Sequence, residues 1–301
     1  MNEGIGHLQD AMADRGYITD RATATAAYLA ITLGKPLLIE GPAGVGKTEV
    51  AKVLARVLAT DLVRLQCYEG LDVATALYEW NYPKQLLHIK LGESSGQSMA
   101  EREAEIFSEA FLLERPLLRA IRAPRRVVLL IDEVDRSDEE FEAFLLEVLA
   151  EHQVSIPEIG TVRAAHEPCV VLTSNRTREL SEALRRRCLY LWVDYPTLEK
   201  ELAIVRAKVP GAGDRLAAEI TGFIQAVRSR RLVKTPGVAE TLDWAHALVA
   251  LHANALDDTT VTETLGCFLK DQADVRQLRQ DIDERGVAAL VAAGQGGYAR
   301  P

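Results

Sequence analysis

The sequence has few cysteines, few aromatic residues and no long apolar segment. Its four cysteines lie far apart and form no C-x-x-C pair, so the usual spacing of a zinc site is missing. The N-terminal residues show no secretory pattern, and together with the cysteines this predicts a reduced, cytoplasmic protein. No apolar run approaches the roughly 20 residues of a membrane span, so we expect no membrane-spanning segment.

An excess of basic residues is also missing. The 301 residues include 35 Lys and Arg against 44 Asp and Glu, which gives a formal net charge of −9. Proteins that bind nucleic acid usually carry a basic surface, so this charge argues against a nucleic-acid partner. With 48 % hydrophobic residues the chain can bury a full core, and its length favours about two domains.

Residues 41–48 read Gly-Pro-Ala-Gly-Val-Gly-Lys-Thr and match the G-x-x-x-x-G-K-[ST] pattern of a phosphate-binding loop. We call them the phosphate loop. An apolar strand precedes it, and apolar residues at helical spacing follow it, as this pattern requires. In such loops, backbone N–H groups surround the phosphates, Lys47 neutralises their charge and Thr48 binds Mg²⁺. The predicted nucleotide-binding residues are Gly41, Pro42, Ala43, Gly44, Val45, Gly46, Lys47, Thr48 and Glu49.

Two acidic residues, Asp132 and Glu133, end the apolar run at residues 127–131. Beside a phosphate loop, such a strand places Asp132 where it can hold Mg²⁺, usually through water, and Glu133 where it can orient and deprotonate a water. Residues 137–140, Ser-Asp-Glu-Glu, predict a capping box that opens a helix. The apolar stripe of this helix, which we assign to the core, is Phe141, Phe144, Leu145, Val148 and Leu149.

Short apolar runs alternate with helical stretches up to about residue 198, which predicts an α/β fold with a parallel sheet. The candidate strands are residues 37–40, 62–66, 127–131, 169–174 and 190–194, and residues 153–163 predict a hairpin around a glycine turn. Beyond them, helices are expected at residues 198–208, 215–228, 238–252, 260–278 and 284–293. We therefore predict an α/β nucleotide-binding domain at residues 1–198 and a helical lid domain at residues 199–301.

Residues from about 69 to 122 form an insertion that is longer than a simple crossover between strands. It contains an aromatic stretch from Tyr78 to Tyr82, then the polar residues 92–96, then an expected helix from Met99 to Leu118. Insertions of this kind often form a functional surface. Packing alone would account equally well for Tyr78 and Trp80, so both interpretations stay open.

Four segments, GPAGVGKT, LLIDEVDR, VVLTSN and ALRRRC, resemble successive motifs of AAA+ ATPases over most of residues 15–240. Segments that begin at Gly16, Leu65 and Tyr78 are similar to the MoxR branch, closest to its carbon monoxide dehydrogenase maturation type. The resemblance implies a P-loop core with a five-stranded parallel sheet of order 5-1-4-3-2 and a C-terminal helical lid, assembled with itself as a ring, often a hexamer. It also implies ATP and Mg²⁺ as cofactors, and ATP-driven remodelling of a client protein, frequently a metalloenzyme such as a molybdenum hydroxylase. A protein with a von Willebrand A domain is the implied partner.

The resemblance also assigns roles to single residues. The phosphate loop matches the Walker A motif, and Asp132 and Glu133 match the Walker B pair. Asn175, after the strand at residues 169–174, matches the sensor that touches the γ-phosphate or positions the attacking water.

An arginine finger, which reaches into the nucleotide site of the neighbouring subunit, is the next implied feature. Of Arg185, Arg186 and Arg187, the third aligns best with it, and Arg136 could face the same interface. Many lids of this family place an arginine at the position of Gly237, and Lys234 is a candidate replacement.

Three other functions share parts of this pattern. A clamp-loader-like AAA+ ATPase acting on nucleic acid would share the Arg187-Cys188 ending, although the net charge opposes it. A P-loop small-molecule kinase would share the phosphate loop but needs no arginine from a second subunit. A scaffold that holds nucleotide without hydrolysing it would have no use for Glu133.

Overall fold

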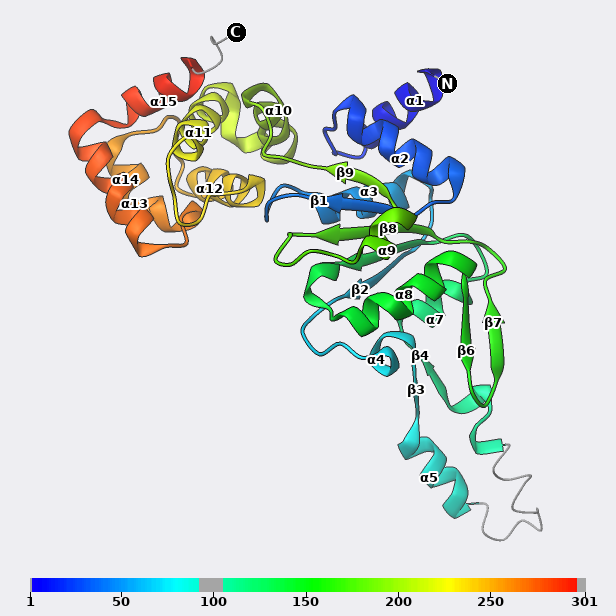
Figure 1. Ribbon diagram of the computed structural model, residues 1–301. Coiled ribbons are helices and arrows are strands. Elements are labelled where there is room, and N and C mark those ends of the chain that lie inside the picture. Colours follow the sequence, from blue (N-terminus) through cyan, green and yellow to red (C-terminus); the bar gives the residue numbers. More distant parts are fainter. Residues whose placement is uncertain (1, 92–104, 297–301) are drawn as a thin grey trace. The chain divides into compact units, whose positions relative to one another are not determined.

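The computed structural model describes residues 2–91 and 105–296 (Figure 1). These residues form two compact units. Of the described residues, the first unit comprises 2–8, 21–40, 48–91 and 105–192, and the second comprises 9–20, 41–47 and 193–296. The chain thus passes between the units several times, and the division into domains at residue 198 stays a prediction.

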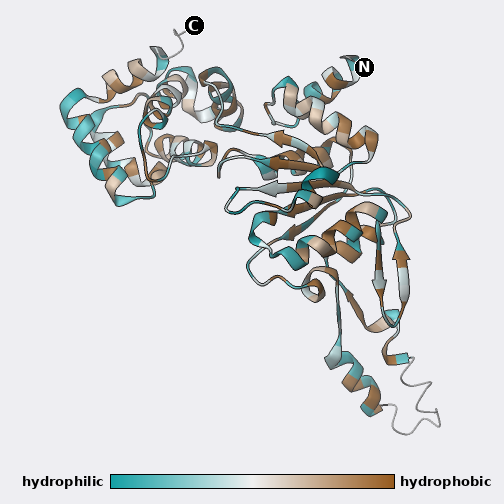
Figure 2. Ribbon diagram, viewed as in Figure 1, coloured by the Kyte–Doolittle hydropathy of each residue, from teal (hydrophilic) through white to brown (hydrophobic). Residues whose placement is uncertain are grey.

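A five-stranded parallel sheet forms the centre of the first unit. Its strands are β1 (Leu37–Glu40), β2 (Leu62–Gln66), β5 (Val128–Asp132), β8 (Cys169–Ser174) and β9 (Leu189–Trp192), in the order β2-β5-β8-β1-β9. Numbered along the chain, this is the predicted order 5-1-4-3-2, which is confirmed. Every residue of β1, β5 and β8 is buried, as expected for parallel strands covered on both faces. Figure 2 shows brown, apolar residues along β1.

Helices and short 3₁₀ turns surround this sheet. They are α2 (Arg21–Leu33), α3 (Lys47–Val57), α7 (Pro116–Ile121), η2 (Val134–Arg136), α8 (Glu139–Glu151) and α9 (Glu182–Arg187), and the chain begins with α1 (Asn2–Ala13). The predicted stripe of α8 lies in the core, with Phe144 partly buried. The predicted cap is wrong by one residue: Asp138 accepts from the amide of Phe141 at 2.8 Å, while the Ser137 hydroxyl donates to the carbonyl of Val134.

The insertion is a two-stranded ladder that carries a helix at its end (Figure 1). It consists of α4 (Val73–Leu77), β3 (Tyr78–Trp80), α5 (Tyr82–Leu91), η1 (Glu109–Phe111) and β4 (Leu112–Glu114), with Tyr78 opposite Glu114. The predicted single helix from Met99 to Leu118 is wrong, because η1 and β4 interrupt it and Leu112 pairs with Trp80 in the ladder; its last residues do lie in a helix, α7. Trp80 is buried and packs edge to face on Phe107, so packing explains it. Met99 and residues 92–96 lie outside the described residues.

The predicted hairpin is confirmed. Strands β6 (Gln153–Ile156) and β7 (Gly160–Arg163) pair antiparallel, with Gly160 opposite Ile156.

The helical part of the second unit follows β9. It contains α10 (Leu198–Lys208), η3 (Pro210–Ala212), α11 (Gly213–Arg228), α12 (Val238–Ala250), α13 (Asp258–Phe268), α14 (Gln272–Arg285) and α15 (Val287–Gly296). Its core is centred on three aromatic residues in mutual contact, Phe223, Trp244 and Phe268. The predicted single helix at residues 260–278 is wrong, because Asp271 accepts from the amides of Ala273 and Asp274 and so starts a new helix.

Candidate nucleotide-binding site

The phosphate loop follows β1 directly and leads into α3. Gly41 has a φ of 155°, and a Cβ atom there would lie 1.9 Å from the carbonyl oxygen of Val193, so only glycine fits. Lys47, the first residue of α3, is 6 % exposed. Its Nζ donates to the carbonyls of Gly41 at 2.8 Å and Pro42 at 2.6 Å. The loop therefore holds this ammonium group at its centre, at the positive end of a helix.

The start of α12 packs against the phosphate loop through two glycines. The amides of Val238 and Ala239 donate to the carbonyl of Gly44 at 2.9 and 3.2 Å. A Cβ atom on Gly237 would lie 2.8 Å from the backbone of Gly44, and one on Gly44 would lie 2.9 Å from Oε2 of Glu240. Close backbone contact thus accounts for glycine at position 237, where the resemblance led us to expect arginine.

Asp132 ends β5 and is the acidic residue that Thr48 reaches. The Thr48 hydroxyl donates to Oδ1 of Asp132 at 2.9 Å, and the hydroxyl of Thr173 on β8 donates to the same oxygen at 2.5 Å. The Asp132 side chain is 3 % exposed. A hydroxyl and a carboxylate, both predicted Mg²⁺ ligands, therefore lie in contact.

Oδ2 of Asp132 is bound by Arg64 on β2. The Arg64 guanidinium donates from Nε at 3.0 Å and from Nη2 at 2.6 Å, and also to Oε1 of Gln66. The Asp132 carboxylate thus accepts from two hydroxyls and two guanidinium N–H groups. Because a carboxylate offers about four lone-pair positions, these four donors fill all of its acceptor positions.

Glu133 adopts a left-handed backbone with a φ of 54°, an unusual conformation for a residue other than glycine. The hydroxyl of Thr173 accepts from its amide at 2.9 Å. The side-chain amides of Asn175 and Gln66 donate to the two carboxylate oxygens of Glu133 at 3.3 and 3.2 Å. Arg136 pairs with it at 3.2 Å. The structure thus brings Glu133 and the predicted sensor Asn175 together.

Asp135 fixes the segment after β8. Its carboxylate accepts from the amides of Asn175 at 3.2 Å and Thr177 at 2.8 Å, and from the Thr177 hydroxyl at 2.7 Å. Burial, followed by the negative charges of Asp132, Asp135 and Glu133, raises the pKa of the Cys67 thiol to about 12. The thiol therefore stays protonated at neutral pH, and a nucleophilic role for Cys67 does not fit this site.

The three candidate finger arginines are exposed on α9. Arg186 pairs with Glu182, a neighbour on its own helix, and Arg185 lies over the ring of Tyr190 at 5.9 Å. Arg187 makes only a long contact of 3.4 Å, from Nη1 to the carbonyl of Ala183, among the contacts recorded for the described residues. Of the three, Arg187 is thus the one most available to an outside group.

Two other predicted residues lie at the edge of this arrangement. Glu49 pairs with Arg56 at 2.7 Å and Lys52 at 3.4 Å on the same helix, so α3 itself uses its charge. Lys234 is exposed, and its backbone amide donates to Asp274 at 3.0 Å.

Comparison with known proteins decides the family. A model of the AAA domain (dynein-related subfamily) matches residues 36–188, just over half of the chain. The chain belongs to this AAA family. The match confirms the AAA+ part of the sequence resemblance.

Relatives of this AAA protein share low identity. The gas vesicle ATPase GvpN1 of Halobacterium salinarum is 23 % identical over 264 residues, which cover 84 % of this chain and 74 % of that protein. An uncharacterized protein of Staphylococcus haemolyticus is 25 % identical over 239 residues, covering 77 % and 82 %. A proline-to-glycine mutant of Thermotoga maritima RuvB matches with a TM-score of 0.50 at 18 % identity, covering 96 % of this chain and 82 % of that one. This last likeness shows the shared fold.

The residues of the AAA protein suit a magnesium nucleotide. Mg²⁺ prefers oxygen ligands such as hydroxyls and carboxylates, and Thr48 and Asp132 supply both at 2.9 Å from each other. The backbone of the phosphate loop, with Gly44 and Gly46 at positive φ, is the kind of surface that surrounds phosphates.

The sequence analysis of the AAA protein gives no role to three residues that this geometry brings in, Arg64, Gln66 and Thr173, and it treats Gly237 only as a departure from an expected arginine. A signal for two of them was present. Arg64 and Gln66 alternate with the buried Val63 and Leu65 in β2, and so lie on one side of the strand that neighbours Asp132.

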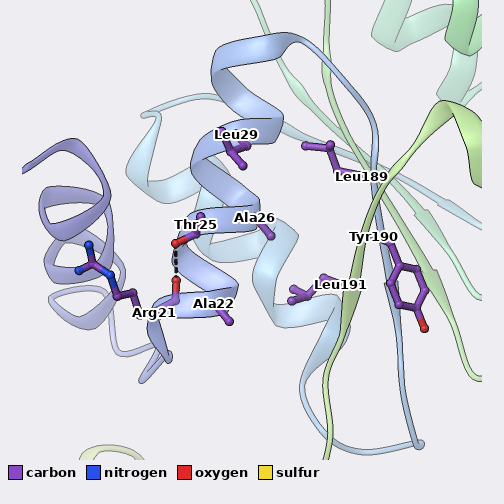
Figure 3. Close-up of a pocket in the computed structure, with 8 residues that line it drawn as sticks. All are labelled: Arg21, Ala22, Thr25, Ala26, Leu29, Leu189, Tyr190 and Leu191. Atoms are coloured by element: carbon purple, nitrogen blue, oxygen red, sulfur yellow. Dashed lines mark hydrogen bonds between the residues drawn. The ribbon is translucent and has the colours of Figure 1, made fainter. Parts of the chain in front are cut away.

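A hollow of about 580 Å³ lies elsewhere in the AAA protein, between α2 and the edge strand β9 (Figure 3). Apolar side chains such as Leu29 and Leu191 line it, and none of the predicted site residues is among those that line it. We therefore assign it no part in nucleotide chemistry.

Among the described residues, no helix is both long enough and apolar enough to cross a bilayer.

Proposed function

We propose that this AAA protein binds ATP with Mg²⁺ and hydrolyses it to ADP and phosphate. The observation that supports the proposal most is the contact between Thr48 and Asp132, beside a Glu133 carboxylate bound by Asn175. Lys47 precedes Thr48 directly in the chain, which supports a role for its ammonium group with the same phosphates. The phosphates would replace the Gly41 and Pro42 carbonyls as acceptors for Lys47.

In this proposal, the Thr48 hydroxyl and the Asp132 carboxylate would hold Mg²⁺, which would supply positive charge to neutralise the phosphates. Glu133 accepts a proton from the attacking water, and Asn175 orients either that water or the γ-phosphate. The backbone of Glu133 supports this role, because its left-handed conformation is of the kind that often holds side chains in place at functional sites.

Arg187 would complete the site of a neighbouring copy. Its exposure on α9 and its lack of a carboxylate partner among the described residues support a ring in which it reaches an adjacent γ-phosphate. In related phosphoryl transfers such an arginine accelerates the reaction by about 10³–10⁵.

The remodelling function rests on the sequence resemblance to the MoxR branch. We propose that ATP turnover drives the maturation of a client, a metalloenzyme such as a molybdenum hydroxylase, together with a von Willebrand A domain protein. The insertion offers a surface for contact with a client, because α5 carries several apolar side chains in solvent. Tyr82, Leu86, Leu87 and Leu91 are all more than half exposed, and Figure 2 shows apolar residues along this helix.

The experiment that tests this function is Glu133→Gln. The change keeps size and removes the proton acceptor, so we expect ATP affinity within about threefold of the original protein and a loss of turnover of at least about 100-fold. Phosphate release and ATP titration measure both. Because the variant would stay in the ATP state, it also serves to capture the client. Unchanged turnover would remove Glu133 from the reaction.

A further inference from the structure

Strand β2 forms one edge of the sheet and carries two polar residues beside Asp132. In the register of β2 and β5, Gln66 lies opposite Asp132 and Arg64 lies two residues earlier. The Arg64 side chain is 49 % exposed, whereas the Asp132 side chain that it binds is 3 % exposed. A half-exposed, always charged guanidinium therefore neutralises a buried carboxylate.

The four hydrogen bonds that the Asp132 carboxylate accepts differ in how easily they can break. Thr48 is itself a predicted Mg²⁺ ligand. Thr173 is 1 % exposed and also accepts from the amide of Glu133, so it is fixed in the sheet. Arg64 has a long side chain with one half in solvent, so its two bonds to Oδ2 are the ones that can open without moving the backbone.

We propose that Arg64 is an internal cation that holds Asp132 in the absence of metal and releases Oδ2 when Mg²⁺ arrives with nucleotide. The inference rests on the proposed nucleotide function. Arg64 would thereby set the Mg²⁺ concentration at which nucleotide binds, as a positioning residue that need not touch the nucleotide. A fixed positive charge close to a divalent cation repels it with an energy well above thermal energy at the dielectric of a protein surface.

Two possible roles of Arg64, competing with Mg²⁺ and supporting Asp132, predict opposite changes in Mg²⁺ affinity when Arg64 is removed. If Arg64 competes with the metal, its removal raises the affinity for Mg²⁺. If Arg64 only keeps Asp132 in place, its removal disorders the carboxylate and lowers that affinity. If Arg64 binds phosphate directly, its removal weakens nucleotide binding even without metal.

The experiment titrates Mg²⁺ into the full chain with a fluorescent ATP analogue carrying an N-methylanthraniloyl group, and repeats the binding in EDTA. It compares the original protein with Arg64→Gln, Arg64→Lys and the control Arg125→Gln. Arg125 also pairs with a carboxylate, Asp61, at 2.9 Å, but both side chains are more than half exposed. A second reading is the melting temperature in EDTA and with saturating Mg²⁺ and analogue.

We expect Arg64→Gln to lower the Mg²⁺ midpoint by about tenfold, a shift set by the lost repulsion. Arg64→Lys keeps the charge without the two-point contact, so its Mg²⁺ midpoint should lie between those of the original protein and Arg64→Gln. The melting temperature of Arg64→Gln should drop in EDTA, because Asp132 loses its cation, and recover with Mg²⁺ and analogue. Arg125→Gln should change nothing.

An unchanged or higher Mg²⁺ midpoint in Arg64→Gln would overturn the inference, and so would weaker analogue binding in EDTA. If Arg64→Gln does not fold, the Arg64→Lys midpoint decides, and a value equal to or above that of the original protein overturns it. Absence of Mg²⁺-dependent binding in the original protein would instead refute the proposed function.

Discussion

The hydroxyl of Thr173 contacts both acidic residues at the end of β5. It donates to Oδ1 of Asp132 and accepts from the amide of Glu133, and its side chain is buried in β8. At the scale of single residues, the candidate site therefore depends on a threonine that lies within the VVLTSN segment but to which the sequence resemblance assigns no role. The contact is set by the neighbouring strands β5 and β8, which pair in parallel.

Thr173→Val tests this contact. Valine has the same shape but can neither donate nor accept, so the Glu133 amide and one Asp132 lone pair lose their partner, at about 1–3 kcal/mol for a buried group. We expect ATP turnover to fall by about tenfold while nucleotide affinity changes little. The control is Thr161→Val on the exposed β7 strand, which should match the original protein. Full turnover in Thr173→Val would show that this hydroxyl does not position the acids.

At the scale of elements, the contact between α12 and the phosphate loop makes Gly237→Ala informative. The added Cβ would meet the Gly44 backbone at 2.8 Å, and backbone cannot move aside cheaply. We expect ATP affinity to fall by about tenfold or more, measured by calorimetric titration. Gly266→Ala in α13 is the control, because nothing lies within 4 Å of its added Cβ. Equal affinities in the two variants would contradict the coupling.

A buried ion pair joins the helices of the second unit. Glu201 on α10 is fully buried, and Arg228 on α11 donates to both of its carboxylate oxygens at 2.6 and 2.7 Å, with Thr241 on α12 adding a third bond. Glu201→Gln should lower the free energy of unfolding by about 3–5 kcal/mol, because Arg228 is left buried without a charge partner. Urea unfolding measures this. Glu182→Gln, in an exposed pair, should change the free energy of unfolding little. Equal losses in the two variants would refute a stabilising role for the buried pair of Glu201 and Arg228.

The sequence could predict those elements that are marked by local patterns. The five strands were predicted to within two residues because each contains a short run of apolar residues, continuous in β1, β5 and the first part of β8 and alternating with polar residues in β2; β1, β2 and β8 match residue for residue. The break at Asp271 was missed because apolar residues recur at helical spacing on both sides of it. The Asp271 side chain accepts from amides of the next helix and so caps its start. The spacing of apolar residues does not reveal such a cap.

The part of the candidate site that could be predicted is likewise the part marked by local sequence patterns. The phosphate loop and the acid pair are contiguous in sequence, so their residues were found. Arg64 and Gly237 act through partners 68 and about 190 positions away, and such contacts depend on strand register and backbone approach. No local pattern encodes them.

At the scale of the whole molecule, the residues of the candidate site are divided between the two compact units. The phosphate loop up to Lys47 groups with the second unit, whereas Thr48 and both acids belong to the first. Because Lys47 and Thr48 are consecutive, the chain itself joins the two sets of residues. The proposed ring, arginine finger and client all depend on nucleotide binding, so that binding is the property to measure first.

Calorimetric titration of ATP into the 301-residue protein, in Mg²⁺ and in EDTA, tests the central claim most directly, with Lys47→Ala as the matched variant. We predict saturable binding that is at least about tenfold tighter with Mg²⁺, and that is lost in Lys47→Ala, because that ammonium is the charge at the centre of the loop. Heats that are the same with and without protein would contradict the account, as would binding that neither Mg²⁺ nor Lys47→Ala alters.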